Sequence, residues 1–455
     1  MVLEAMASSR IARGSAGRSE GEGGGRGSER TRKVLLGIGF WVQGFRCFPW
    51  MGVNFFLKDS IGVDSSTLQI LQNSANFPMV AKPFYGIISD SFYISGQHRV
   101  PYIALGAFLQ AVSWLVLALF SPSSISFFAI TVCLLIGNLG ASIAEVANDA
   151  IVAEIGKQSS SSSKNAQSHP SGELQSFVWM TSSLGGVLGN ILVGIAMNRF
   201  SPQAMFLVFG IILSLQYLIT VFIKESSLGL PKAPPNLRIR KQLSELLVVL
   251  QKPEISYSIL WFAASYAVIP ALTGTMFYYQ TQYLRIESSV LGISKVFGQV
   301  AMLLWGVVYN SHLKSMSPRK LISAIQASMA VFMVSDVLFV KGVYRMMGIP
   351  DSLYVVVFSG FLEVLYFFKI LPFSVLMAQL CPPGCEGSIM AFLMSAIALA
   401  FIVSGYLGVA LSSFLMVKGN DFSGLPYALM IQAASTLVPL CWSSCIPDGF
   451  KHKMN

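Results

Sequence analysis

Twelve long apolar segments, separated by short polar connections, dominate the sequence. Each has about the 20 mostly apolar residues that a helix needs to cross the hydrocarbon core of a bilayer. Only 11% of the side chains are charged, against about 25% in soluble domains, which is too few to cover a soluble surface. The pattern therefore predicts an all-α integral membrane protein with about 12 transmembrane helices. The segments are approximately 34–57, 67–90, 101–120, 126–153, 174–197, 203–223, 255–279, 289–310, 318–341, 351–380, 387–413 and 424–446.

The longest connection between apolar segments divides the chain into two groups of six. It covers residues 224–254 and contains Pro231, Pro234 and Pro235. We therefore expect two six-helix halves joined by a linker on the cytosolic side. The predicted parts are a tail at 1–33, an N-terminal half at 34–223, the linker at 224–254, a C-terminal half at 255–446 and a C-terminal tail at 447–455.

The N-terminal tail is rich in Gly, Ser and Arg and has no apolar periodicity, so it is predicted to be disordered. Its Arg and Ser content is typical of a plastid or mitochondrial transit peptide. Four acidic residues argue against that interpretation, because transit peptides are poor in acids. They are Glu4, Glu20, Glu22 and Glu29. Both interpretations stay open, and a plastid membrane is one predicted location beside other cellular membranes.

The distribution of Lys and Arg predicts the orientation, since cytosolic loops of membrane proteins carry an excess of them. Of the 31 Lys and Arg, 21 fall on the side that holds both termini and the central linker, and seven fall on the opposite side. We therefore expect the termini on the cytosolic or stromal side. The net charge of +10 follows from this topology, and nucleic acid is not an expected partner.

A short pattern follows the second segment of each half. Gly86, Asp90 and Arg99 have the same spacing as Gly306, Asn310 and Arg319. Parallel repeats of this kind occur in transporters built from two six-helix halves. Together with Lys82, these residues are predicted to gate the cytosolic side, with the glycines allowing close helix contact and Asp90 pairing with an Arg or a helix N-terminus. Ordinary polar loop ends are the alternative.

Ionisable residues inside predicted spans each cost at least ~2.5–3.5 kcal/mol and normally face a cavity or a partner. Seven are candidates: Arg46, Lys82, Glu145, Asp149, Asp336, Glu363 and Lys369. Lys82 is assigned to the gate and Asp336 to a helix end, and the other five are predicted to bind substrate or couple protons. Glu145 and Asp149 are four residues apart, hence on one helix face. Arg46 is the expected cation beside them, and the pair is predicted to bind and release protons. A static ion pair that fixes helix register is the alternative interpretation.

The sequence contains no nucleotide-binding Gly-Lys-Ser/Thr loop, nucleophile elbow or zinc signature. Its four histidines are well separated, so neither a metal nor a cofactor is expected. An enzymatic activity is therefore not predicted.

Several motifs resemble those of one transporter family. Lys82-Pro-Phe-Tyr-Gly-Ile-Ile-Ser-Asp-Ser91 resembles the "KPLYGxxSDS" stretch of the folate–biopterin transporter family, within the major facilitator superfamily. The segments 144–150, 381–388 and 41–44 are similar to its "ADVxxDA", "CPPGxEGT" and "FVQG" blocks, in the family's order. The resemblance covers roughly residues 40–400 and includes plant members, several of them assigned to plastid membranes.

The resemblance implies a major-facilitator-type fold and alternating-access transport of folates or pterins by a proton symporter in contact with membrane lipid. It assigns substrate and coupling roles to Glu145 and Asp149. Glu145 stands where the family more often has Asp, and Arg99 is alone where the family often has several basic residues. The alternatives are another organic anion or an amino acid as substrate, a membrane-embedded enzyme, or a non-transporting receptor. The sequence does not predict the oligomeric state.

Overall fold

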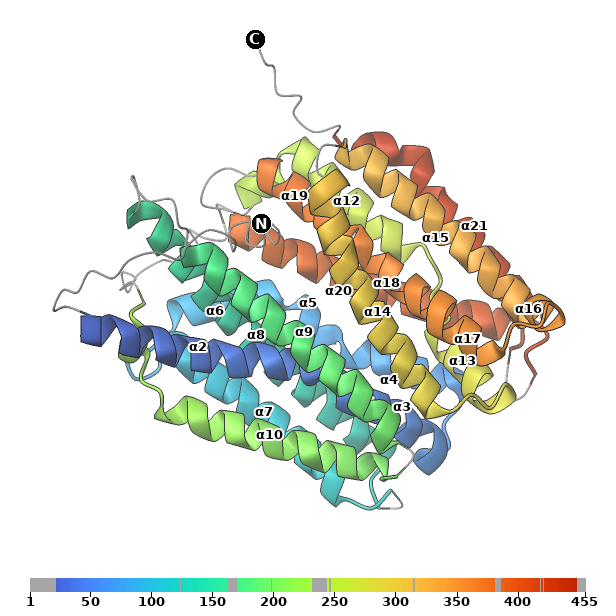
Figure 1. Cartoon of the computed structure of the whole chain (residues 1–455), viewed down its shortest axis with the longest axis horizontal. Helices are drawn as coiled ribbons and strands as arrows, with labels where there is room; N and C mark the ends of the chain where they lie inside the picture. Colours follow the sequence, from blue (N-terminus) through green and yellow to red (C-terminus); the bar gives the residue numbers. More distant parts are fainter. Residues whose placement is uncertain are drawn as a thin grey trace, which may run out of the picture. The chain divides into compact units, whose positions relative to one another are not determined.

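The computed structural model describes residues 22–122, 124–162, 170–197, 199–230, 244, 247–313, 316–380, 386–417, 419 and 421–447. These residues are almost entirely helical (Figure 1). Among them, β-type pairing is limited to one bridge between Ile94 and Gln97. The α-helices are α2 (Glu22–Phe45), α3 (Cys47–Phe55), α4 (Ser65–Ala75), α5 (Phe77–Val80), α6 (Lys82–Ser91), α7 (Val100–Leu119), α8 (Phe127–Ser162), α9 (Pro170–Ala196), α10 (Pro202–Phe222), α12 (Pro253–Ala267), α13 (Thr273–Tyr278), α14 (Ser288–Val308), α15 (Pro318–Val340), α16 (Val343–Met346), α17 (Asp351–Tyr354), α18 (Gly360–Phe368), α19 (Ile370–Leu380), α20 (Glu386–Phe414) and α21 (Leu425–Leu437).

Short π and 3-10 segments connect or extend several of these helices. They are η2 (Phe56–Ile61), η3 (Glu225–Leu228), η4 (Tyr279–Tyr283), η5 (Tyr309–Leu313), η6 (Val355–Ser359) and η7 (Val438–Cys445).

Nine helical stretches in the described part of the chain are long and apolar enough to cross a membrane. The other three predicted spans, 34–57, 67–90 and 255–279, coincide with helices that are interrupted along their length. The prediction of an all-helical, multi-pass membrane protein is therefore confirmed, and twelve spans are compatible with the structure.

Prolines explain the interruptions in two of these three spans, 67–90 and 255–279, because proline lacks an N–H and clashes with the preceding turn. Pro78 lies in the first turn of α5, and Pro83 lies in the first turn of α6. Pro270 lies between α12 and α13.

Helix α2 also differs from the prediction at its start, since it begins at Glu22, inside the predicted disordered tail. An ion pair of 2.7 Å between Glu29 and Lys33 supports this first part of the helix.

The chain forms two compact units, which do not follow the linker boundary. The first, unit 1, comprises residues 1–50, 82–189 and 203–243. Its core is a cluster of apolar side chains from α2, α7, α8, α9 and η3. Helices α7 and α8 cross closely at two glycines: a Cβ added at Gly106 would lie 2.4 Å from the Gly140 carbonyl oxygen. Small residues at such crossings let membrane helices approach each other.

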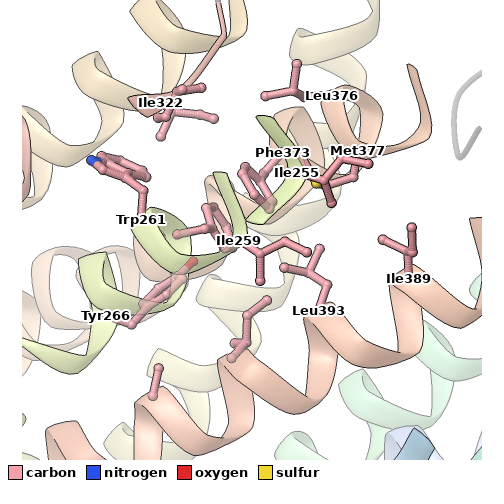
Figure 2. Close-up of a cluster of buried hydrophobic side chains, with 14 of the residues drawn as sticks. Ile255, Ile259, Trp261, Tyr266, Ile322, Phe373, Leu376, Met377, Ile389 and Leu393 are labelled. Atoms are coloured by element: carbon pink, nitrogen blue, oxygen red, sulfur yellow. The ribbon is translucent and has the colours of Figure 1, made fainter. Parts of the chain in front are cut away.

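The second compact unit, unit 2, comprises residues 51–81, 190–202 and 244–455. Figure 2 shows its apolar core, built mainly by α12, α19 and α20. Phe262 and Phe373 stack there with ring centroids 3.8 Å apart. Trp261 is buried beside them, and its indole N–H donates to the Pro439 carbonyl at 3.0 Å. Unit 2 includes the start of the second predicted span together with the whole predicted C-terminal half.

Candidate functional site

The carboxylate of Glu145 is the centre of a three-residue ion cluster in unit 1. Arg46 Nη1 lies 2.9 Å from Glu145 Oε1, and Lys82 Nζ lies 2.6 Å from Glu145 Oε2. The Glu145 side chain is 8% exposed and each cationic side chain is 23% exposed. The predicted contact between Arg46 and the α8 carboxylates is present. Lys82 binds the same carboxylate as Arg46, and its gating role stays a prediction.

Both cations come from points where a span is interrupted. Arg46 occupies the turn between α2 and α3, and Lys82 is the first residue of α6, directly after the break at Ala81. Pro83 occupies the first helical turn of α6, where the missing N–H costs no hydrogen bond. The interruptions in the first two spans thus bring two long cationic side chains to one carboxylate of α8.

Asp149 lies on α8 one turn beyond Glu145, and it differs from Glu145 in its surroundings. Asp149 is exposed, whereas Glu145 is buried. Within the part of the chain that the structure describes, Asp149 makes no ion pair or hydrogen bond. When Asp149 is ionised, the four charged groups sum to zero; when it is protonated, they sum to +1. This carboxylate therefore sets the net charge of the cluster.

A second ion cluster surrounds Arg99, at the start of α7. Arg99 Nη2 lies 2.5 Å from Asp90 Oδ1 and 2.5 Å from Glu154 Oε1. Its Nη1 donates to Ser89 Oγ at 2.7 Å. The predicted pairing of Asp90 with an arginine is present, and the partner is the Arg99 of the same motif. Glu154, on α8, completes the cluster and was not among the predicted residues.

Glu225, in η3, holds in position the loop that leads into α7. Its carboxylate accepts hydrogen bonds from the backbone N–H groups of His98, Arg99 and Val100, at 3.0, 2.8 and 3.1 Å. These are donors at the N-terminus of α7 that have no partner inside the helix, so the carboxylate caps the helix. His98 Nδ1 lies 2.6 Å from Glu225 Oε1.

The pKa values of His98 and Glu225 reflect this contact. Burial lowers the pKa of His98, but its interactions with Glu154 and Glu225 outweigh burial and raise that pKa to about 9. Burial raises the pKa of Glu225, but the His98 hydrogen bond and the backbone N–H groups of Arg99 and Val100 outweigh it and lower that pKa to about 2. The loop is therefore held by a charged His98–Glu225 pair at neutral pH.

Gly86 does not permit an unusually close helix contact. A Cβ added at Gly86 would meet Val146 Cγ1 at 3.5 Å, which is ordinary van der Waals contact. No described residue lies within 4 Å of such a Cβ at Gly306. The predicted reason for these glycines, close approach of two helices, is not seen at either position.

The second copy of the motif is built differently from the first. Arg319 Nε donates to the Ile446 carbonyl at 2.6 Å, and Nη2 donates to the Ser444 carbonyl at 3.2 Å. The backbone of Asn310 lies in η5, and its side chain lies outside the described part of the structure. Arg319 thus binds the end of η7.

Glu363 and Lys369 belong to unit 2 and do not bind each other, as their six-residue spacing predicts. Glu363 of α18 pairs with Lys295 of α14, and the Glu363 side chain is 49% exposed. Lys369 is completely buried; its Nζ donates to Ser265 Oγ at 3.0 Å and to Gln326 Oε1 at 2.6 Å. Roles for Glu363 and Lys369 in substrate binding stay predictions.

Comparison with known proteins identifies the chain's relatives. Residues 43–453 match the BT1 family over most of the sequence. The chain belongs to the BT1 family. It is 63% identical over 420 residues to the Arabidopsis thaliana protein named probable folate-biopterin transporter 7, covering 92% of this chain and 94% of that relative. It is 42% identical over 418 residues to probable folate-biopterin transporter 8, chloroplastic, from the same plant, covering 91% of this chain and 75% of that relative.

Solved structures with the same fold include transporters of unrelated sequence. A D-xylose-proton symporter matches this BT1-family chain with a TM-score of 0.65 and 15% identity, covering 92% of this chain and 98% of the other. The nucleoside transporter NupG matches with a TM-score of 0.66 and 14% identity, covering 92% and 98%. The fold is therefore that of major-facilitator transporters, which confirms the predicted fold class.

Sequence reasoning missed the acidic partners in unit 1 of this BT1-family protein. Glu154 lies near the end of a long apolar segment, and Glu225 directly follows another, where single carboxylates are common. The predicted topology could have identified them. Glu154 and Glu225 both follow spans that end on the side of the membrane where Arg99 lies, so both were candidates for pairing with the basic residues of that loop. Lys295 lies in the predicted span 289–310 and in α14, and it was not among the predicted site residues although it pairs with Glu363.

Proposed function

We propose that this protein is a secondary active transporter that moves folates or pterins across a membrane by alternating access, coupled to protons. Family membership supports the cargo, because relatives carry the names folate-biopterin transporter, in Synechocystis, and folate transporter 1, in Plasmodium falciparum. The major-facilitator fold supports the transport cycle. The observation that carries the proposal is Asp149, which is exposed and has no partner among the described residues, beside the Arg46–Glu145–Lys82 cluster.

The charge count of the cluster gives a physical basis for coupling. Glu145 is shared by two cations, so one positive charge stays uncompensated unless Asp149 is ionised. A proton on Asp149 would leave that charge available for an anionic substrate group. Release of the proton would restore the Asp149 carboxylate as a competitor for the same cations and favour release of the substrate. Substrate and proton would then move in the same direction.

Folates fit this scheme because their glutamate portion carries carboxylates. Arg46 can offer two parallel N–H donors to a carboxylate, whereas Lys82 acts as a compact point charge. Glu363 and Lys369 are proposed as further substrate or coupling groups on the basis of the sequence. The same chemistry would also accept another small organic anion, which is the second candidate cargo.

We further propose that the Asp90–Arg99 cluster forms the cytosolic gate. Arg99 connects α6, α7 and α8 through Asp90, Ser89 and Glu154. In the second half, Gly306, Asn310 and Arg319 are proposed as the counterpart. The termini and the linker are proposed to lie on this same cytosolic or stromal side.

A plastid membrane is the proposed location. Two relatives named chloroplastic, at 42% and 39% identity, support it. The relative at 63% identity has no such word in its name. A fluorescent fusion to the C-terminus of the full chain tests this proposal, and signal confined to another membrane would refute the plastid location without affecting the transport proposal.

The decisive experiment is uptake by vesicles that contain the purified protein. Radiolabelled folate and a labelled pterin are offered with and without an inward proton gradient, to the wild type and to Asp149→Asn. Asp351→Asn is the matched control, because that carboxylate lies on α17 and pairs with Arg345 at 3.0 Å. We expect gradient-stimulated uptake in the wild type and the control, and none in Asp149→Asn.

Each other outcome has a defined meaning. Uptake that responds to the gradient in Asp149→Asn as in the wild type would remove Asp149 from the coupling mechanism. Absence of both compounds from folded wild-type vesicles would reject folates and pterins as cargo, and a panel of organic anions and amino acids would follow.

A further inference from the structure

Gln69, in the second turn of α4, has its side-chain amide surrounded by backbone groups of other helices. The residue is 2% exposed. Its Nε2 donates to the carbonyl oxygens of Ala271 and Gly405, at 2.6 and 2.7 Å, and its Oε1 accepts from the backbone N–H of Gly274 at 2.8 Å. Both N–H donors of the amide are therefore hydrogen-bonded, and so is its oxygen. A glutamine side chain suits this position because its amide offers two donors together with an acceptor oxygen.

One of these backbone groups, the Ala271 carbonyl, belongs to the interruption between α12 and α13, and another, the Gly274 N–H, lies in the first turn of α13. Residues 268–272 are not helical there, and non-helical backbone within a membrane protein needs partners from the protein or from water. Within the interruption, Ala271 N donates to the Ser404 carbonyl at 3.0 Å, and the Ile269 carbonyl accepts from Ser404 Oγ. The Ala271 carbonyl and the Gly274 N–H are left for Gln69.

Helix α4 packs tightly against this interruption and against α20. A Cβ added at Gly405 would lie 2.0 Å from Asn73 Nδ2, and one added at Gly408 would lie 1.7 Å from the Ala271 carbonyl oxygen. Ser74 Oγ lies 2.8 Å from the Tyr406 hydroxyl. A larger residue at Gly405 would displace the Asn73 side chain, and one at Gly408 would displace the backbone at Ala271.

We propose that Gln69 is a gate residue, which holds the transporter closed at the end of the second span opposite to Asp90. Helix α4 belongs to the predicted N-terminal half, whereas α12, α13 and α20 belong to the predicted C-terminal half. Alternating access requires such halves to separate on one side at a time. Separation at this end breaks all three hydrogen bonds of Gln69 together, and water then hydrates the two carbonyls and the N–H group. The proposal does not depend on the identity of the cargo.

The chain offers a matched control on the same helix. Gln72 lies three residues further along α4, and its side-chain amide donates to Asn54 Oδ1. Gln72 and Asn54 both belong to the predicted N-terminal half. Gln69→Leu and Gln72→Leu are thus the same substitution on one helix, and only the first removes hydrogen bonds between the two halves.

The experiment measures distances between spin labels in the reconstituted full chain. Labels attached to genetically encoded azide residues, which leave the native cysteines untouched, are placed at Leu119 and Met346, which are 74% and 79% exposed. A second labelled pair, Phe92 and Met316, reports the cytosolic end. In Gln69→Leu we expect the ratio of long to short distances at the first pair to rise about tenfold, equivalent to about 1.4 kcal/mol. Gln72→Leu should keep the wild-type ratio.

A pH-dependent variant separates gating from general packing. In Gln69→Glu, an ionised carboxylate would face two carbonyl oxygens and can donate to neither. Acidification should return the ratio toward the wild-type value, because the protonated acid regains one donor. A wild-type distance distribution in folded Gln69→Leu would overturn the proposal.

Tyr406→Phe covers the case in which both Gln69 variants fail to fold. This substitution removes only the hydrogen bond between Tyr406 and Ser74, which also joins the two halves. The ratio should then move in the same direction by a smaller factor. An unchanged ratio in Tyr406→Phe would overturn the proposal in that case.

Discussion

The ion cluster around Glu145 allows stability and transport to be separated by two single substitutions. Glu145→Gln removes the negative charge that Arg46 and Lys82 share at 2.9 and 2.6 Å. Because the three side chains are mostly buried, the two cations would be left without compensation. Loss of one partner of a buried ion pair typically costs 3–5 kcal/mol. Since each cation is 23% exposed and can recruit water, we expect the lower limit, about 3 kcal/mol.

Asp149→Asn is the comparison, because Asp149 is exposed and forms no ion pair or hydrogen bond with the described residues. Substitutions away from such contacts usually change the free energy of unfolding by less than about 0.5 kcal/mol. Unfolding is followed by denaturant titration in detergent, and transport is followed by vesicle uptake. We expect both variants to lose gradient-stimulated uptake, and only Glu145→Gln to lose stability.

A triple variant tests whether the lost stability comes from uncompensated charge. Replacing a buried ion cluster by neutral residues of similar size is often neutral or stabilising. Arg46→Gln, Lys82→Met and Glu145→Gln combined should therefore recover most of the stability lost in Glu145→Gln, without recovering uptake. The electrostatic reasoning would be refuted if Glu145→Gln unfolded like the wild type, or if the triple variant were less stable than Glu145→Gln.

Three further predictions concern other parts of the molecule. Because the pKa of His98 is raised from 6.5 to about 9, its stabilisation is complete below pH 6.5 and is lost as the pH rises to about 9; we expect a loss of about 3 kcal/mol over that range, measured by denaturant titration and absent in His98→Gln. Exchanging the charges of the exposed Lys295–Glu363 pair should change stability by less than about 1 kcal/mol, and a larger loss would show that the pair is buried in the membrane protein's working state. Gly106→Val should prevent the close crossing of α7 and α8, and folded, monodisperse protein in size-exclusion chromatography would contradict this.

The fold and the centre of the site were predictable because they depend on strong, local signals. Apolar length alone gives the spans, and the four-residue spacing of Glu145 and Asp149 places both on one face of α8. The energetic cost of a charge in the membrane then points to Arg46 as a partner. Asp90 and Arg99 were grouped by the repeated sequence pattern that contains both, and the structure shows that they bind each other.

The remaining parts depend on which segments meet in three dimensions, and sequence spacing does not contain that information. Lys82 was assigned to the gate because it begins the motif that contains Asp90. The break at Ala81 instead places it beside Glu145, and the rest of the motif continues along α6 to Asp90. Gln69 was missed because an amide inside a polar stretch gives no electrostatic signal. Pro270 indicated an interrupted helix, but nothing near it in the sequence identified the side chain that binds the interruption.

The distribution of charged and neutral contacts follows from what must move during transport. Every ion pair described here joins residues of one predicted half, as in the clusters of Glu145 and Arg99. Breaking a buried ion pair leaves uncompensated charges and costs several kcal/mol, so such pairs suit parts that stay together. A hydrogen bond between neutral groups contributes only about 1 kcal/mol net, and water can replace it. Gln69 binds its three backbone partners without any net charge, which is the kind of contact that can open and close in each transport cycle.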